Sequence, residues 1–255
     1  MKQREIRLIF VWLIVAFGAM FVDEAVSQDP IGYTMSSPNH AEQGIFSLFA
    51  LMRQGATMMN TSYNLDNDSS LQKYVSIRKP YDDVYYIPAE LVELDTSYII
   101  TRTTKPLLRP EAARALTTMA KDFYIEFNKK FVLISAYRSY QDQKRLVGEW
   151  CSRARCAQAG TSEHQSGLAS DLAVGNDKWG IYSISDKKNK YYKWLENNAH
   201  KYGFHNTFQK WIDVDGQMEE GWHWRYLGKW LATFLYENGW TLGEYYTRTQ
   251  ENLVQ

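Results

Sequence analysis

The sequence contains few cysteines and prolines and no excess of charge of either sign. Its 255 residues include two cysteines and six prolines, and 29 Lys plus Arg are balanced by 29 Asp plus Glu. Two cysteines exclude a disulfide-rich scaffold and a closed structural zinc site of cysteines alone, which needs four ligands. A net charge of zero supplies no positive field, so we expect no nucleic-acid partner.

Long apolar runs are also scarce, and the run at the N-terminus is short for a membrane span. The cationic start MKQREIR precedes an apolar stretch over positions 8–22. A spanning helix needs about 20 apolar residues, whereas the core of a secretory signal has about 7–15. We therefore predict a signal peptide over 1–27, cleaved after Ser27, and a mature protein that is periplasmic or extracellular. An uncleaved anchor is the alternative, and it would be the expected contact with a membrane.

The remaining chain divides into an irregular arm over 28–86 and a domain over 87–255. Apolar periodicity in the domain predicts helices over 110–127, 139–150, 185–202 and 230–237, and strands over 131–136 and 168–174. A hairpin is expected from strands 208–212 and 217–226, joined through 213–216. These elements predict an α+β fold in which helices pack on a small, mainly antiparallel sheet.

Two histidine-containing segments carry the chemistry, SEHQSGLASD over 162–171 and EEGWHWRY over 219–226. Two imidazoles and one carboxylate, with a fourth position left for water, form a catalytic zinc site. Strand alternation places Asp171 between two alanines, and it places His223 opposite a row of aromatic residues. Gly221 permits a bend that brings Glu220 to the face of His223. We expect the zinc site on the face of the sheet, although an exposed Asp171 and a surface Glu220 remain open from spacing alone. His200 and His205 are expected on the surface.

The two cysteines, Cys151 and Cys156, lie close together just before the first histidine segment. An oxidising compartment favours a disulfide between them, and this bond would brace the turn ahead of His164. Two buried thiols are the alternative.

Three motifs together resemble the D-alanyl-D-alanine carboxypeptidases of the VanY type. They are Ser162-x-His164-x-x-Gly167-x-Ala169-x-Asp171, Glu220-x-Trp222-His223 and Tyr137-Arg138-Ser139. The likeness extends from about residue 86 to 228, and this family belongs to the metallopeptidase group that includes lysostaphin and the hedgehog domain. One departure is Gly221, where the family usually has proline.

The resemblance implies an enzyme that removes the terminal D-alanine from peptidoglycan stem peptides, with D,D or L,D specificity. It also implies a role for each matched residue. One zinc ion would be held by His164, Asp171 and His223; Glu220 would be the general base, Arg138 would stabilise the oxyanion, and Gln143 and Ser162 would seat the terminal residue of the substrate.

Two other functions remain open at this point. One is an endopeptidase that cuts cross-bridges in the cell wall, and the other is a non-catalytic, zinc-stabilised binding domain. The combination of Glu220 with Arg138 argues against the binding domain, because a structural metal needs neither a base nor an oxyanion donor.

Overall fold

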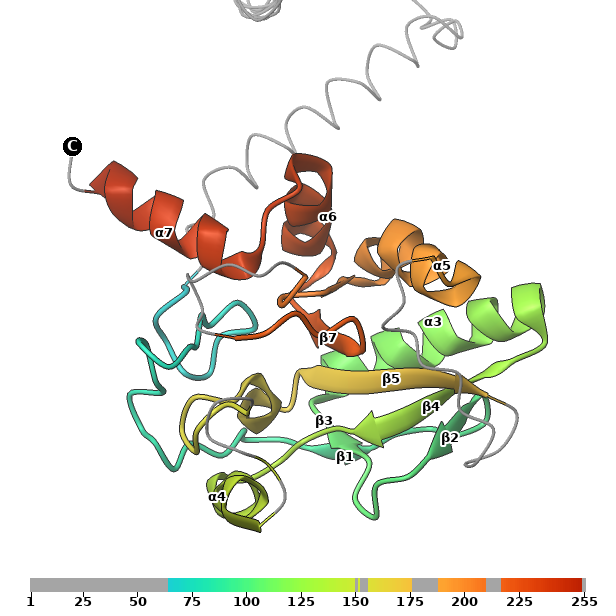
Figure 1. The fold of residues 1–255 in the computed structure, drawn as a ribbon, viewed down its shortest axis with the longest axis horizontal. Helices are drawn as coiled ribbons and strands as arrows, with labels where there is room; N and C mark the ends of the chain where they lie inside the picture. Colours follow the sequence, from blue (N-terminus) through green and yellow to red (C-terminus); the bar gives the residue numbers. More distant parts are fainter. Residues whose placement is uncertain (1–63, 150, 152–155, 176–187, 210–216, 254–255) are drawn as a thin grey trace, which may run out of the picture. The chain divides into compact units, whose positions relative to one another are not determined.

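The computed structural model describes residues 64–149, 151, 156–175, 188–209 and 217–253 (Figure 1). The predicted signal peptide, most of the arm and the predicted hairpin connection over 213–216 lie outside these residues. Residues 62–255 form one compact unit. Within the part of the chain that is described, no helix has both the length and the apolar character needed to span a membrane.

The centre of the fold is a five-stranded sheet with the order β2-β4-β5-β7-β6. Its strands are β2 (Ile99–Thr101), β4 (Lys130–Ser135), β5 (Ala169–Gly175), β7 (His223–Tyr226) and β6 (Phe204–His205). β2 pairs with β4 in parallel, and the other neighbours are antiparallel. A two-stranded antiparallel pair joins β1 (Val92–Glu93) to β3 (Leu107–Leu108). The predicted α+β class and mainly antiparallel sheet are confirmed.

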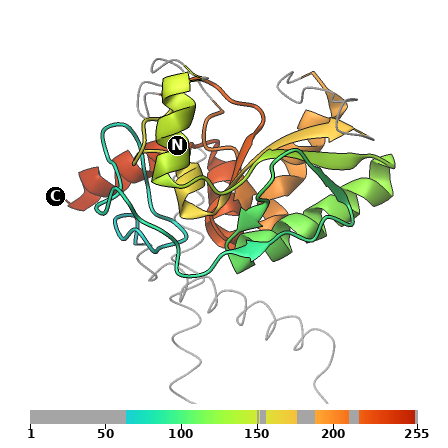
Figure 2. The ribbon, with the colours of Figure 1, turned by 90° about the horizontal axis from the view of Figure 1, so that it is seen from below.

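Five α-helices surround the strands in the described residues. They are α3 (Pro110–Phe127), α4 (Tyr140–Glu149), α5 (Lys190–Asn198), α6 (Lys229–Asn238) and α7 (Leu242–Leu253). Short 3-10 turns, η1 (Glu163–Ser166) and η2 (Ala199–Tyr202), precede β5 and β6. α3 starts at Pro110, whose fixed φ suits a first helical position, and ends at Asn128 in the left-handed region. Figure 2 shows the strands lying between α3 and α4.

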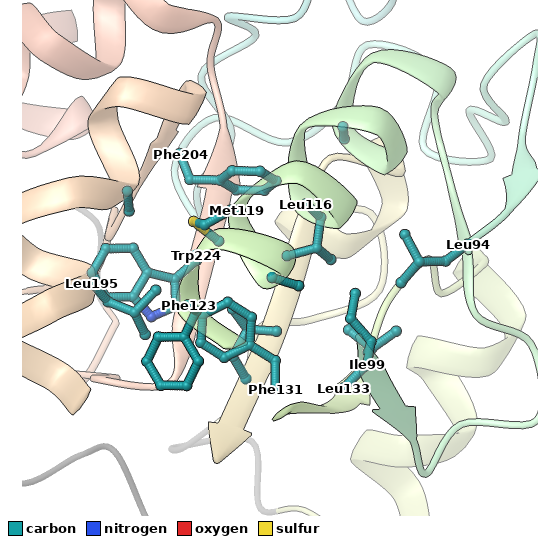
Figure 3. Packing of buried hydrophobic residues seen from close by; sticks show 14 of the residues in the cluster. Leu94, Ile99, Leu116, Met119, Phe123, Phe131, Leu133, Leu195, Phe204 and Trp224 are labelled. Carbon is teal, nitrogen blue, oxygen red and sulfur yellow. The ribbon is translucent and has the colours of Figure 1, made fainter. Parts of the chain in front are cut away.

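The main hydrophobic core lies between α3, α5 and one face of the sheet (Figure 3). Phe123 of α3 stacks on Phe131 of β4 with ring centroids 4.3 Å apart. Leu172 and Val174 of β5 are fully buried in the same core. Because side chains alternate along a strand, Asp171, which precedes Leu172, is directed to the opposite face. The core therefore fixes which face of β5 is free to carry a functional site.

Two parts of the predicted secondary structure are wrong. β7 pairs with Phe204–His205 and begins only at His223, so the predicted strand over 217–226 starts too early. Most of its predicted partner, 208–212, lies outside the described residues. Gly203 at φ 91° makes the pairing of β6 with β7 possible, because a Cβ there would lie 2.7 Å from the ring of Tyr226. The helix predicted over 185–202 has its cap at Asn189 and gives way to the 3-10 turn η2. Helix α7 was not predicted.

His200 and His205 are also buried, with 8% and 5% of their surface exposed, so the prediction that they lie on the surface is wrong. His200 stacks on Tyr236 at 4.0 Å. His205 lies within β6 and contacts the main-chain oxygen of Trp240 through Nε2 at 3.0 Å. Neither residue lies among the predicted metal ligands.

Candidate metal centre and active site

Three residues from two paired strands and one turn meet on the face of the sheet opposite the core. Asp171 of β5 and His223 of β7 are register partners, and His164 lies on η1 just before β5. Asp171 Oδ2 lies 3.2 Å from His164 Nε2, and Asp171 Oδ1 lies 3.1 Å from His223 Nδ1. One nitrogen or oxygen atom from each of the three residues lies within 4.8 Å of the others, so the cluster could hold a metal ion.

The other nitrogen of each imidazole faces a group that accepts hydrogen bonds. His164 Nδ1 lies 2.7 Å from the main-chain oxygen of Ala136, and His223 Nε2 lies 2.9 Å from Glu163 Oε2. A carbonyl or carboxylate oxygen requires the proton on the facing nitrogen, which leaves His164 Nε2 and His223 Nδ1 as ligand atoms. Two oriented imidazoles and a carboxylate are the donor set of a catalytic zinc site, so the residues present fit this ion.

The buried charges of the site favour ionised carboxylates. Burial alone would raise the pKa of Asp171, but the neighbouring imidazoles of His164 and His223 hold it well below its usual range. For Glu163, burial is likewise outweighed, by Arg225, His223 and Thr207, which together lower its pKa to about 2. Burial lowers the pKa of His164, which is the direction that a metal-binding imidazole needs.

Glu220 lies beside this cluster on a turn that its main chain holds in place. Its N–H donates to the oxygen of Phe208 at 2.9 Å, and its own oxygen accepts from Asn206 Nδ2 at 3.0 Å and from the N–H of His223 at 3.1 Å. The carboxylate lies 4.0 Å from His223 Nδ1. Burial raises the pKa of Glu220 to about 7, the range in which a carboxylate both accepts and returns a proton.

Arg138 follows β4 and enters the site from the other side. Its Nη1 donates to Ser135 Oγ at 3.1 Å and lies 3.9 Å from Asp171 Oδ2. The main-chain N–H of Arg138 donates to the oxygen of His164 at 3.3 Å. The guanidinium is therefore held next to the candidate metal ligands.

All seven of the residues that the sequence singled out line one cavity of about 160 Å³. Gln143, on α4, is 1% exposed and donates through Nε2 to the oxygen of Ala157 at 2.7 Å. The main-chain oxygen of Ser162 accepts from the hydroxyl of Tyr81 at 3.3 Å. The predicted disulfide between Cys151 and Cys156 is confirmed, with Cα atoms 6.1 Å apart, and Cys156 forms part of the cavity wall.

Sequence reasoning missed the buried partners behind the ligands. Glu163 contacts His223, Thr207 and Arg225, and Arg225 in turn donates to the main-chain oxygen of Lys73. One signal was available for Arg225, which stands two positions after His223 and so faces the same side of β7. No comparable pattern marks Thr207 or Lys73.

Comparisons with known proteins identify carboxypeptidases as similar to this chain. Residues 105–229 match the family model described as VanY: D-alanyl-D-alanine carboxypeptidase. The Bacillus subtilis protein YodJ, assigned as a carboxypeptidase, is 34% identical over 179 residues, which cover 65% of this chain and 63% of YodJ. The chain spans less than two thirds of the length of the curated relatives that it matches.

Solved structures of carboxypeptidases also resemble this chain. The LD-carboxypeptidase LdcB is 30% identical with a TM-score of 0.60, over 71% of this chain and 87% of LdcB. VanYB in complex with D-alanine-D-alanine is 25% identical with a TM-score of 0.54, over 69% of this chain and 97% of VanYB. A D,D-pentapeptidase VanY in complex with Zn(II), 24% identical with a TM-score of 0.54 over 70% of this chain and 99% of that one, shares the fold. Residues 105–229 of this chain therefore form a domain of the VanY family.

Proposed function

We propose that this protein is a zinc-dependent carboxypeptidase that releases the terminal D-alanine from peptidoglycan stem peptides. The observation that carries the proposal is the placement of Glu220 and Arg138 on the cavity that contains His164, Asp171 and His223. A structural metal site needs neither a base nor an oxyanion donor, whereas peptide hydrolysis needs both.

One zinc ion per chain would be held by His164 Nε2, a carboxylate oxygen of Asp171 and His223 Nδ1. When bound, zinc supplies a Lewis acid that lowers the pKa of water and polarises the scissile carbonyl. VanY is solved in complex with Zn(II), and this chain has its fold.

The side chains of the cavity supply the proton transfers and charge stabilisation. Glu220 removes the proton from the attacking water and returns it to the leaving amine, a cycle suited to a carboxyl with a pKa of about 7. Arg138 lies 3.9 Å from Asp171 and stabilises the oxyanion that develops on the scissile carbonyl. Gln143 and Ser162, on the cavity wall, seat the terminal residue of the peptide.

Two solved relatives support a substrate that ends in D-alanine. LdcB is an LD-carboxypeptidase that recognises peptidoglycan, and VanYB is solved with D-alanine-D-alanine. Both kinds of peptide end in a D-residue with a free carboxylate, and they differ in the residue before it. The proposal therefore covers the D,D and L,D bonds, and the assay below separates them.

The test is incubation of the purified protein with a muropeptide that has a pentapeptide stem, one that has a tetrapeptide stem and a cross-linked dimer. Mass spectrometry of the products should show loss of one alanine from a stem. Activity should disappear with a strong chelator and return with zinc. Cleavage of the dimer alone would indicate the cross-bridge endopeptidase. Zinc binding without any hydrolysis would indicate a binding domain and would overturn the proposal.

We also propose that the protein is exported through its first 27 residues, as their charge and apolar pattern suggest. N-terminal sequencing of the protein recovered from the producing cell should begin at Gln28. A sequence beginning at Met1 in a membrane fraction would support the uncleaved anchor instead.

A further inference from the structure

Behind the metal site lies a buried charge cluster to which the proposed reaction assigns no role. Glu163 and Arg225 are 3% and 0% exposed, and Arg225 Nη1 donates to Glu163 Oε1 at 2.7 Å. Two charges are rarely buried so completely without a partner or a function. The pair lies directly behind His223, on the side away from Asp171.

The Glu163 carboxylate accepts hydrogen bonds from three buried side chains, one of which is the imidazole of His223. Oε1 accepts from Arg225, and Oε2 accepts from Thr207 Oγ1 at 2.6 Å and from His223 Nε2 at 2.9 Å. An ionised carboxylate only accepts hydrogen bonds, so it requires the proton on Nε2 and leaves Nδ1 for the metal. The hydrogen bonds from Arg225 and Thr207 fix the plane of the carboxylate. A flip of the His223 ring would break the hydrogen bond between its Nε2 and Glu163.

The cluster is closed by a segment that precedes the region matched by the family model. Arg225 Nη2 donates to the main-chain oxygen of Lys73, and Lys73 Nζ, fully buried, forms an ion pair with Asp68 at 2.8 Å. Asp68 also accepts from the N–H groups of Asp82 and Asp83 at 3.1 and 2.8 Å. The family match covers residues 105–229. Residues 66–83, which lie outside that region, therefore hold Arg225 in place behind Glu163 and His223.

We infer that Glu163 is a positioning residue that holds His223 with Nδ1 toward the metal, and that Arg225 and residues 66–83 hold Glu163. The inference rests on the proposed function, because it assumes that His223 binds zinc. Such partners behind a metal-binding histidine typically change metal affinity by about 10–100-fold when they are removed. The alternative is that the cluster only stabilises the fold.

A set of variants separates these two roles. Glu163→Gln keeps the shape but removes the charge, and it leaves the buried Arg225 unpaired. The double variant Glu163→Gln/Arg225→Met replaces the charged pair by neutral side chains and should recover stability. Thr207→Val removes one hydrogen bond to Glu163 and leaves the charged pair intact. Thr241→Val is the matched control, because Thr241 is also 1% exposed and its hydroxyl accepts from the N–H of Glu244 instead.

For each variant we would measure zinc affinity by competition with a chelating dye, the melting temperature of the metal-free protein and the ¹⁵N resonances of His223 in the zinc-loaded protein. Zinc affinity should fall about 10–100-fold in both Glu163 variants, even where the double variant regains its melting temperature. The Nε2–H resonance of His223 should move in these variants. Thr207→Val should weaken zinc binding more than Thr241→Val does.

Two results would overturn the inference. One is zinc affinity that follows the melting temperature and returns in the double variant, and the other is equal affinity in Thr207→Val and Thr241→Val. If Glu163→Gln does not fold, the comparison of the two threonine variants decides the matter. A wild-type protein that binds no zinc would instead contradict the proposed function, and this is seen before any variant is compared.

Discussion

The two sides of His223 are built in different ways. On the metal side, Asp171 and His223 are register partners on antiparallel strands, and side-chain alternation alone directs both to one face. On the opposite side, Glu163 depends on Arg225, which depends on a main-chain oxygen of Lys73 in an irregular segment. The first arrangement is a property of regular strands. The second depends on contacts between residues 152 positions apart in the chain, so spacing does not encode it.

The largest expected effect is on the metal side, at the base. Glu220→Gln should lower kcat by about 10²–10⁴-fold, because an amide of the same shape cannot accept the proton. Zinc content, measured by elemental analysis, should stay at one ion per chain. Near-normal turnover would show that the base is another group, and Glu219 would be tested next.

Arg138 should give the next largest effect. Arg138→Ala should lower kcat and kcat/KM together by about 10²–10³-fold, because an oxyanion donor acts mainly in the transition state. Zinc content should not change. Lysine should rescue the rate only in part, since it lacks the planar fork of the guanidinium. An increase in KM alone would make Arg138 an anchor for the substrate carboxylate.

The difference between the two sides explains what the sequence could predict. Alternation along 168–174 placed Asp171 on one face with two alanines, and the structure buries the other face, which includes Leu172, in the core. The sheet type followed from the same kind of pattern. The three proposed ligands lie together in the structure as the motifs suggested. The bounds of long periodic segments such as α3 were also predicted closely, because many apolar residues at helical spacing mark the buried face of the helix.

The failures occur where few residues carry the signal. β6 has two residues, so it shows no period, and its pairing depends on the left-handed Gly203. His205 is buried by this pairing and by a contact with Trp240, which is 35 positions away. Nothing in the sequence marks Glu163, because charged residues are usually exposed and only the fold brings Arg225 to it.

The stability of residues 66–83 offers a sharper test of the second side. Lys73→Met removes a buried ammonium and leaves Asp68 without its ion-pair partner, so the free energy of unfolding should fall by about 1–3 kcal/mol. Lys79→Met is the control within the same segment, because its ion pair with Asp66 is half-exposed and should contribute about 0–1 kcal/mol. Urea unfolding of both variants measures the difference. An equal fall in the free energy of unfolding in both variants would mean that the buried ion pair stabilises this segment no more than the half-exposed one does.

The smallest expected effect on the reaction is at the disulfide, which braces a third region, the part of the cavity wall that includes Cys156. Cys151 and Cys156 are separated by five positions, and a cross-link over so short a loop stabilises a fold by about 2 kcal/mol. Cys156 and Ala157 line the cavity, and Gln143 is fixed by its hydrogen bond to Ala157. Replacing both cysteines by serine should therefore make the substrate-binding wall less rigid and raise KM several-fold. The proposed metal ligands, Glu220 and Arg138 are unchanged, so kcat should stay within about twofold. This pattern is expected when a lost interaction stabilises the bound substrate and the transition state equally, because such a loss raises KM alone. Steady-state kinetics of the variant, and of the wild-type protein with and without reductant, measure this directly. If kcat fell while KM stayed constant, the cavity wall and the metal side would be coupled, and the separation of the site into independent regions would be wrong.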